Sequence, residues 1–469
     1  MIEDFIKDYE NKSVHPYWIS SLELLTPNRF DLIFKILFLE YNIKASQFAI
    51  EIYKEHLDVL TSGKFTEYGN TQKSDFLSFL NDFKKIYSSI LFKGFDKEKS
   101  IIPISNSQTI LNGAHRLSIC IFLGLDVFCK IYNLKDHLYD INFFLQRGID
   151  KSFVDFGILK FLNLKSNYYL AIIWPSASKS IKFEHLLGEI LYTKEVKFNA
   201  LGAHNFLAQV YKDHKWIGDF ENGYSGAITK QAEAFNNFSN VRCYFFKNDS
   251  FENVLQIKNQ IRHLFGIGKA SIHITDNKNE TIDLANYILN ENSIHFLNNA
   301  KPFKFKKAYN LLNSFNKQLV SNSINTDDIL IDGGLVLSLY GIRDSNDLDY
   351  LSLNKIDFKD DYDHHISEVK YYKKDIGSLI YNPKFYFYFN GLKFISLPTL
   401  RLMKINRNQT KDKIDILLID KVSKSSSFIF LKIKNSLVKF KFKFIAYLIP
   451  ITKKLKIYNF SKYIYKLFN

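Results

Sequence analysis

The pattern of apolar and polar residues changes along the chain and predicts a mixed α/β protein with several domains. Over residues 1–95, apolar residues recur at spacings of three and four, which is typical of amphipathic helices. Residues 100–133 instead alternate short apolar runs with glycine turns, and residues 165–302 alternate strand-like runs with helical segments. The fold class that follows is α/β and α+β, multidomain.

Five sections follow from these patterns. They are a helical lead-in (1–95), a small α/β segment (96–160), an α/β middle domain (165–302), an α+β domain (303–420) and a basic amphipathic tail (421–469). A chain of 469 residues with 46% apolar and 16% aromatic residues has ample material for more than one core. Three scattered cysteines are too few for a disulfide framework, so we expect all three to be packed as free thiols: Cys120, Cys129 and Cys243.

Positive charge is concentrated at the C-terminal end. Twelve lysines between Lys421 and Asn469, a stretch without Arg, Asp or Glu, contribute +12 of the formal net charge of +15 and leave +3 for the rest. A nearly neutral body argues against nucleic acid as a partner, whereas a basic tail rich in aromatic and aliphatic residues fits an anionic membrane surface. A packed basic hairpin and a nucleic-acid contact remain alternatives for the tail.

The same features indicate where the chain works. No apolar run approaches the roughly 18 residues that a spanning helix needs, and the N-terminus lacks the pattern of a secretion signal. We therefore expect a cytoplasmic protein that is peripheral at the inner membrane face.

Residues 100–133 predict a strand, a turn, a short second strand, a glycine turn, a helix that opens at Ala114 or His115, a stop at Gly124 and another strand. A turn at Gly113 followed by a helix start presents free backbone N–H groups, and the side chains of His115 and Arg116 add cationic donors. This combination favours phosphate. The alternative is a structural strand-turn-helix with a satisfied histidine.

The sequence NGAHR at 112–116 resembles the turn of the ParB and sulfiredoxin superfamily, over residues 100–133 only. The resemblance implies that the turn and the helix start bind nucleotide phosphates, and the superfamily includes CTP-hydrolysing partition proteins, sulfiredoxins and free amino-acid kinases. Ala114 stands where sulfiredoxins have their cysteine nucleophile, so reductase chemistry is not expected. A kinase-like site would take Glu67 as its candidate base.

The middle domain contains one chemically dense stretch, IRHLFGIGKASIHITDNKNE (261–280). Asp276 and Glu280 are spaced i, i+4 where a helix begins. The favoured interpretation is a capped helix start, with Thr275 or Asp276 as the cap and Glu280 placed well for the helix dipole. The alternative is a second anion or metal site.

The richest stretch is IDGGLVLSLYGIRDSNDLDYL (331–351). It predicts a strand, a Gly-Gly turn, a helix over 335–340, and a second strand that carries Asp347 and Asp349. Side chains two apart on a strand point to the same face, where two carboxylates repel unless a cation lies between them. The spacing therefore favours Mg²⁺ or Mn²⁺, and the two glycines let the backbone approach a triphosphate closely.

This arrangement resembles the nucleotidyltransferase superfamily of the polymerase-beta type, in which a helix-opening Gly-Gly precedes Asp-x-Asp. The resemblance extends to FNGLKFISLPTLRLMKINRNQTKDKIDILLID (389–420). Five residues of that stretch match the later part of the pattern: Lys404, Arg407, Lys411, Asp412 and Asp415.

The resemblance implies metal-dependent nucleotidyl or phosphoryl transfer. It assigns metal binding to Asp347 and Asp349, phosphate binding to Gly333 and Gly334, and stabilisation of developing charge to Arg343 or Lys404. The family usually adds a third carboxylate on a later strand, but the corresponding stretch KFYFYFNGLKFIS (384–396) offers Asn390 and no acid. Either an acid from DFKDDYDHH (357–365) takes its place, or the domain binds nucleotide without transferring it.

The chain as a whole resembles bacterial surface-polysaccharide biosynthesis proteins, whose basic amphipathic endings are similar to its tail. The expected function is transfer from a nucleoside triphosphate or nucleotide-activated donor to a sugar or small alcohol during capsule or lipopolysaccharide synthesis. One alternative is a ParB/sulfiredoxin-like nucleotide-dependent kinase with an inactive nucleotidyltransferase-like domain. Another is a non-catalytic module that binds nucleotide or nucleic acid.

Overall fold

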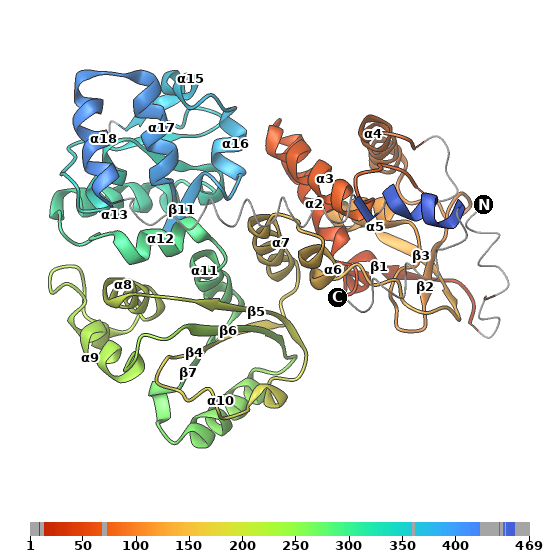
Figure 1. Cartoon of the computed structure of the whole chain (residues 1–469), viewed down its shortest axis with the longest axis horizontal. Coiled ribbons are helices and arrows are strands. Elements are labelled where there is room, and N and C mark those ends of the chain that lie inside the picture. The colour runs from red at the N-terminus through yellow and green to blue at the C-terminus, as the bar shows by residue number, and fades with distance from the viewer. Residues whose placement is uncertain are drawn as a thin grey trace. The chain divides into compact units, whose positions relative to one another are not determined.

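The computed structural model describes residues 9, 14–67, 73–358, 362–422, 440, 444–445 and 447–454. Over these ranges the chain is mixed α/β, as expected, and it divides into two compact units (Figure 1). Unit 1 comprises Met1–Ile43, Ala49–Val154 and Ser426–Asn469, and unit 2 comprises Lys44–Phe48 and Asp155–Ser425. Most of residues 1–160 thus belong to unit 1, and residues 165–420 belong to unit 2.

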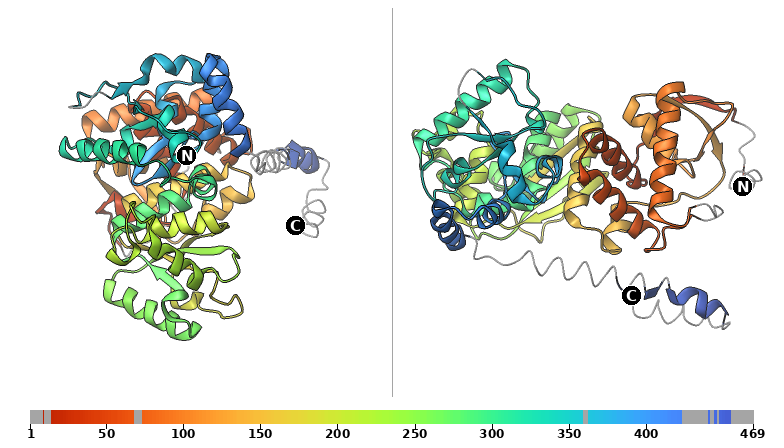
Figure 2. Two further views of the ribbon diagram at one scale, coloured as in Figure 1. Left: turned by 90° about the vertical axis from the view of Figure 1, so that its left-hand side faces the viewer. Right: turned by 90° about the horizontal axis from the view of Figure 1, so that it is seen from above.

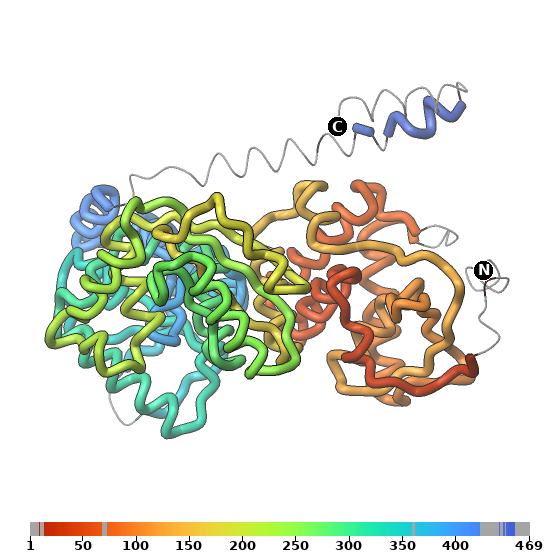
Figure 3. The backbone as a smooth tube through the Cα atoms, turned by 90° about the horizontal axis from the view of Figure 1, so that it is seen from below, coloured from red at the N-terminus to blue at the C-terminus, as the bar shows by residue number. Residues whose placement is uncertain are grey.

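Unit 1 is built on a three-stranded sheet with the strand order β1-β3-β2. The central strand β3 (Asp126–Tyr132) is antiparallel to β1 (Tyr17–Ser20) and parallel to β2 (Ile102–Ser105). Helix α5 (Ala114–Leu123) connects the two parallel strands, because parallel neighbours require a crossover. Helix α2 (Asp31–Ile43) packs against α5, and the path of the chain can be followed in Figure 3.

Over residues 100–133 the predicted first strand, helix and last strand are confirmed, but where a short second strand was expected, Ile110 forms only an isolated bridge with Ile104. Helix α5 begins at Ala114 and ends at Gly124, which adopts the left-handed conformation of a glycine C-cap. The expected helical lead-in contains the helices α3 (Gln47–Leu60) and α4 (Phe76–Lys93) but also β1. Strand β1 was missed because four residues that alternate between half-buried and exposed are too short for a clear periodic signal.

The first part of unit 2 contains a four-stranded antiparallel sheet with the order β5-β6-β4-β7. Its strands are β4 (Tyr168–Ile173), β5 (Ile190–Val196), β6 (Val241–Lys247) and β7 (Ile272–Ile274). Figure 1 shows α10 on one face and α8 and α11 on the other. These helices are α8 (Ala200–Val210), α10 (Phe251–Phe265) and α11 (Lys278–Ile288). The apolar run of β4 is buried along nearly its whole length, which explains its strand-like pattern.

The second part of unit 2 contains a five-stranded mixed sheet with the order β10-β9-β8-β12-β11. Figure 2 shows this part of the chain in teal and blue in two further views. Its strands are β8 (Leu330–Asp332), β9 (Asp349–Leu351), β10 (Asp363–His364), β11 (Tyr386–Phe389) and β12 (Leu392–Ile395). Strand β8 is antiparallel to β9 and parallel to β12, so it occupies the centre of the sheet. Residues at its C-terminal end are therefore held from both sides.

Further helices complete both units. Around the five-stranded sheet are α13 (Lys306–Ser321), α14 (Gly334–Leu339), α15 (Val369–Tyr372), α16 (Ile376–Tyr381), α17 (Leu397–Arg407) and α18 (Thr410–Val422). The remaining ones are α6 (Ile141–Gln146), α7 (Lys151–Leu164), α9 (Ser225–Ala234) and α12 (Glu291–Asn299). All three cysteines are buried as free thiols, as expected. Among the described residues, no helix is both long enough and apolar enough to cross a bilayer.

A buried histidine is the least satisfied polar group in the core of unit 1. His56 on α3 is fully buried and packs against Phe34 and Phe144. Neither ring nitrogen has a hydrogen-bond partner in the described part of the chain. Burial, aided by the nearby Lys35 ammonium, lowers the pKa of His56 well below its usual value.

We expect His56→Leu to weaken the pH dependence of unfolding. A histidine whose pKa is lower in the folded chain contributes stability above its unfolded pKa of about 6.5, and that stability is lost as pH falls, because the unfolded chain gains the proton first. Near neutral pH the variant should also gain about 1 to 3 kcal/mol, since no buried nitrogen is left unpaired.

Thermal unfolding midpoints near neutral pH and about one unit below 6.5 would test this expectation. The exposed His15→Leu is the matched control in the same unit. If the lower pH decreased the unfolding midpoint by the same amount in wild type and in His56→Leu, the expectation would be contradicted.

Candidate functional site

The Gly-Gly turn lies between β8 and α14, and both predicted metal ligands reach it. Gly333 has a positive φ of 68°, and α14 begins at Gly334, one residue before the expected start. A Cβ added to Gly333 would lie 1.8 Å from Oδ2 of Asp349, and one added to Gly334 would lie 3.5 Å from Oδ1 of Asp347. Only glycine therefore leaves room for the Asp349 carboxylate at this turn.

The two acids reach the turn by a route that differs from the prediction. Strand β9 begins at Asp349, so Asp347 lies in the preceding loop and not on the same strand. In that loop Ser345 donates a hydrogen bond of 2.6 Å to Oδ1 of Asp347. Asp347 is exposed, whereas Asp349 is only 6% exposed. Convergence thus comes from a folded loop and not from strand alternation.

A third carboxylate stands beside them, and sequence reasoning missed it. Asp332 is the last residue of β8, lies directly opposite Asp349 in the β8–β9 ladder and is fully buried. The feature of the sequence that could have revealed Asp332 is its position, at the end of an apolar strand and immediately before the two glycines. Asn390, which stood where the third acid was sought, lies in the turn between β11 and β12. From the stretch 357–365, Asp363 pairs with Asp349 in the sheet.

His365 bridges the two buried acids. Its Nδ1 lies 3.4 Å from Oδ2 of Asp332 and its Nε2 lies 3.2 Å from Oδ1 of Asp349. Burial alone would lower the pKa of His365, but the two carboxylates raise it above its usual value. Burial raises the pKa of Asp349 to about 6; the carboxylates of Asp347 and Asp332 add to this rise, and His365 opposes it.

The donor set fits a divalent cation that arrives with a phosphate-bearing substrate. Within the described ranges, no group of three or more His, Cys, Asp or Glu side chains is arranged so that it could hold a metal ion. Mg²⁺ sites that bind nucleotides commonly use one or two carboxylates and fill the other positions with water and substrate phosphates. Asp347 and Asp349, gathered at a glycine turn that a Cβ would fill, supply such a pair.

The helical hairpin α17–α18 fixes the candidate cations. Arg343 binds Asp415 through two nitrogens at 2.8 and 3.0 Å, and Lys404 binds the same carboxylate at 2.9 Å. Lys404 is 2% exposed and also faces Asp412, whereas the Arg343 side chain is 37% exposed. Arg343 is thus the accessible cation of the two, and Lys404 lies inside the ion-pair network.

The other residues of the predicted pattern extend this network or lie outside it. Arg407 binds the fully buried Asp412 through two nitrogens at 2.7 and 3.0 Å and binds Glu368 at 3.0 Å. Lys411 is exposed on α18. Most of the lysines, arginines and aspartates of the predicted pattern therefore join α17 to α18, and the pairs Arg343–Asp415 and Arg407–Glu368 join this hairpin to the rest of the domain.

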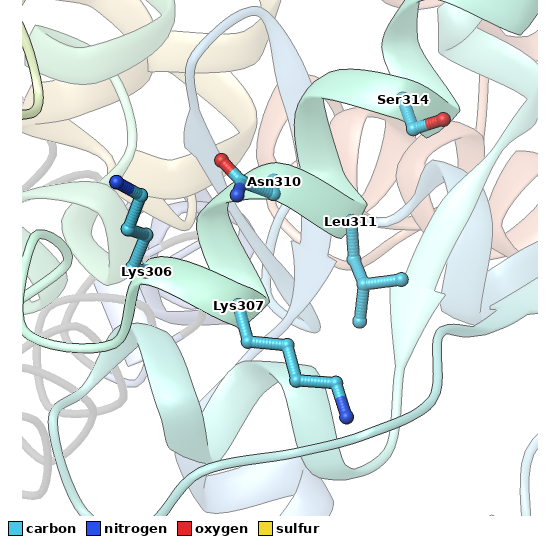
Figure 4. Close-up of a pocket in the computed structure, with 5 residues that line it drawn as sticks. All are labelled: Lys306, Lys307, Asn310, Leu311 and Ser314. Atoms are coloured by element: carbon cyan, nitrogen blue, oxygen red, sulfur yellow. The ribbon is translucent and has the colours of Figure 1, made fainter.

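An open depression of about 550 Å³ lies along α13, whose lining residues Figure 4 shows. Its lining residues all come from α13: Lys306, Lys307, Asn310, Leu311 and Ser314. Lys307 donates a 2.7 Å hydrogen bond to Oδ1 of Asn346, the residue before Asp347. The acids do not line this depression, so it borders the loop without enclosing the site.

The Gly113 turn in unit 1 has the predicted backbone but not the predicted histidine chemistry. Gly113 is left-handed with φ 87°, and a Cβ there would lie 3.0 Å from Nη2 of Arg116, whose Nη1 donates a hydrogen bond to the Ser100 hydroxyl. His115 Nε2 lies 2.8 Å from the Tyr53 hydroxyl. Burial lowers the pKa of His115 well below its usual value, so the expected cationic donor is neutral near pH 7.

Two weaker candidates have ordinary partners. Glu67 forms a 2.8 Å ion pair with Lys73. In the dense stretch of the middle domain, the side chain of Asn277 caps α11, which corrects the predicted cap at Thr275 or Asp276. Glu280 accepts the backbone N–H of Asp276 and lies 2.8 Å from His273.

The predicted basic tail lies largely outside the described residues. Residues 447–454 are helical, and the side chains of Phe440, Phe444 and Tyr447 are between 53% and 68% exposed.

Comparisons of the chain with protein-family models, with curated proteins and with solved structures found no match.

We expect Gly333→Ala to displace Asp349 from the turn, because the new Cβ overlaps its carboxylate. Gly391→Ala is the matched control: it also has a positive φ, of 76°, but a Cβ there meets no atom within 4 Å. The control should lose about 1 to 2 kcal/mol of unfolding free energy from backbone strain, and Gly333→Ala should lose clearly more. Equal losses in denaturant unfolding would contradict the close approach of Asp349 to Gly333.

Proposed function

We propose that residues 303–422 bind Mg²⁺ or Mn²⁺ together with the phosphates of a nucleoside triphosphate or nucleotide-activated donor. A nucleotidyl or phosphoryl group of this donor is then transferred to the hydroxyl oxygen of a sugar or small alcohol; the phosphoanhydride bond to the rest of the donor breaks, pyrophosphate or a nucleotide leaves, and the hydroxyl proton passes to solvent. The single observation that carries this proposal is the convergence of Asp347 and Asp349 on the turn at Gly333 and Gly334. Two carboxylates at a turn without side chains suit a cation shared with phosphate oxygens.

Each residue of the site has a distinct part in the proposed reaction. Asp347 and Asp349 would hold the cation, which would neutralise charge on the phosphate oxygens. The absence of side chains at Gly333 and Gly334 lets a phosphate lie against the backbone. Arg343, fixed by Asp415, faces charge that develops during transfer. Transfer of such a group leaves little covalent chemistry for the protein to do. The protein contributes by positioning the reactants and by stabilising their charge.

The setting that we propose is surface-polysaccharide synthesis, at capsule or lipopolysaccharide, on the inner membrane face. It is supported by the twelve lysines of the tail, which alternate with aromatic and aliphatic residues. Such a segment adsorbs to anionic lipid through both its charge and its apolar groups, with roughly 1 kcal/mol contributed by each lysine near the surface. Acceptors of this pathway class are commonly attached to lipid, so membrane attachment would bring the site to its substrate.

A nucleotide-dependent kinase centred on Gly113 is the second candidate. The left-handed turn with Arg116 beside it supports phosphate binding there. The neutral, tyrosine-bonded His115 offers less to a phosphate than the imidazolium that the sequence suggested.

We expect the double variant Asp347→Asn, Asp349→Asn to abolish metal-dependent nucleotide turnover, because it removes both anionic ligands. Turnover is followed by the product masses formed from each nucleoside triphosphate with Mg²⁺ or Mn²⁺ and candidate sugars. Asp213→Asn, an exposed acid of the same unit outside the site, is the control and should retain full activity. Turnover that survives in the double variant would move the chemistry elsewhere, with the Gly113 turn as the next place to test.

We also expect deletion of residues 425–469 to release the protein from vesicles that contain anionic lipid. Co-sedimentation should show wild type bound, with less binding at higher salt, since the lysine contribution is screened. Vesicles of neutral lipid are the control for charge. Undiminished sedimentation of the truncated chain would refute attachment through the tail.

A further inference from the structure

Two buried carboxylates face each other at the centre of the five-stranded sheet. Asp332 on β8 and Asp349 on β9 are direct partners in the antiparallel ladder, and neither is more than 6% exposed. Like charges directly opposite each other in a sheet repel, and burial strengthens this repulsion. Such a pair persists only when other groups compensate it.

The compensating groups form a chain of contacts. The Tyr372 hydroxyl donates a hydrogen bond to Oδ1 of Asp332, and Oδ2 of Asp332 faces Nδ1 of His365 at 3.4 Å. On its other side, Nε2 of His365 faces Oδ1 of Asp349 at 3.2 Å. The chain therefore runs from Tyr372 through Asp332 and His365 to Asp349, and it leaves Oδ2 of Asp349 against Gly333.

The segment that carries His365 and Tyr372 is itself anchored. Glu368, in the same turn as His365, binds Arg407 of α17 at 3.0 Å. The backbone carbonyl of Tyr371 accepts a 2.7 Å hydrogen bond from Asn406. The turn that carries His365 is thus anchored to α17 of the hairpin, and His365 in turn contacts Asp349 of strand β9.

We propose that Tyr372, Asp332 and His365 are positioning residues that hold the Asp349 carboxylate at the Gly-Gly turn for cation binding, an inference that rests on the proposed function. Asp332 is then the third acid of the site, but it acts through His365 and does not contact the cation. Its complete burial and the two side chains that occupy its oxygens favour this role over direct ligation. Groups that orient a metal ligand typically change metal affinity by about 10- to 100-fold when removed.

Mn²⁺ binding to the full-length protein tests the inference without requiring turnover. Free Mn²⁺ is measured by electron paramagnetic resonance as protein is added, with folding checked by circular dichroism. We expect His365→Phe to weaken Mn²⁺ binding about tenfold or more, and His365→Gln, which keeps one polar contact, to restore part of it. Tyr372→Phe, which removes one hydroxyl only, should weaken Mn²⁺ binding by a smaller factor. It tests the inference if His365→Phe does not fold.

The adjacent histidine supplies the matched control. His364 lies 3.0 Å from the carbonyl of Ser352 and stacks on Tyr350, so His364→Phe should bind Mn²⁺ as wild type does. Wild-type affinity in His365→Phe, or in both His365→Gln and Tyr372→Phe if His365→Phe does not fold, with binding lost in Asp349→Asn, overturns the inference and leaves the proposed function standing. A wild-type chain that binds no Mn²⁺ overturns the proposed function and the inference together.

Discussion

The contact between the Asp349 carboxylate and the backbone of Gly333 constrains everything around the candidate site. A carboxylate can lie there only because the residue has no Cβ and adopts a positive φ. It must also be held there, since burial and neighbouring acids raise its pKa to about 6 and disfavour its charge. The pairing of β8 with β9 in the sheet keeps the carboxylate in place, and so does the contact of its Oδ1 with Nε2 of His365. A cation shared with Asp347 would relieve the same repulsion.

The ion pairs around the site fix the positions of the charged groups near Asp349 and Gly333. Asp415 holds Arg343 beside the acids, and Lys404 shares that carboxylate from inside the hairpin. Arg407 ties Asp412 to Glu368 and thereby connects the hairpin to the turn that carries His365. Buried ion pairs of this kind contribute little net stability compared with apolar packing, so their value lies in fixing where charged groups stand. A site that works through electrostatics needs that precision of placement more than it needs extra stability.

Local signals in the sequence predicted much of this region, and tertiary contacts decided the rest. The strand, the glycine turn, the short helix and the two acids were all visible, because glycine pairs and apolar runs report local conformation directly. The loop that turns Asp347 toward Gly334 could not be predicted, because a Ser345 hydrogen bond shapes it and not a periodic pattern. Asp332 and His365 were missed as a pair because they lie 33 residues apart and meet only through the sheet. For the same reason, the residues next to His115 in the sequence did not reveal that it is buried, neutral and in contact with the Tyr53 hydroxyl.

The central claim is that Asp347 and Asp349 share one divalent cation at the glycine turn. Anomalous diffraction from crystals of the full-length protein grown with Mn²⁺ would test it most directly, because the signal locates the metal without any assumption about substrate. The account predicts a peak bonded to both carboxylates beside Gly333, with Asp332 outside the coordination sphere. Mn²⁺ bound elsewhere with no peak at the turn, or a peak ligated by Asp332 in place of Asp347, would contradict it.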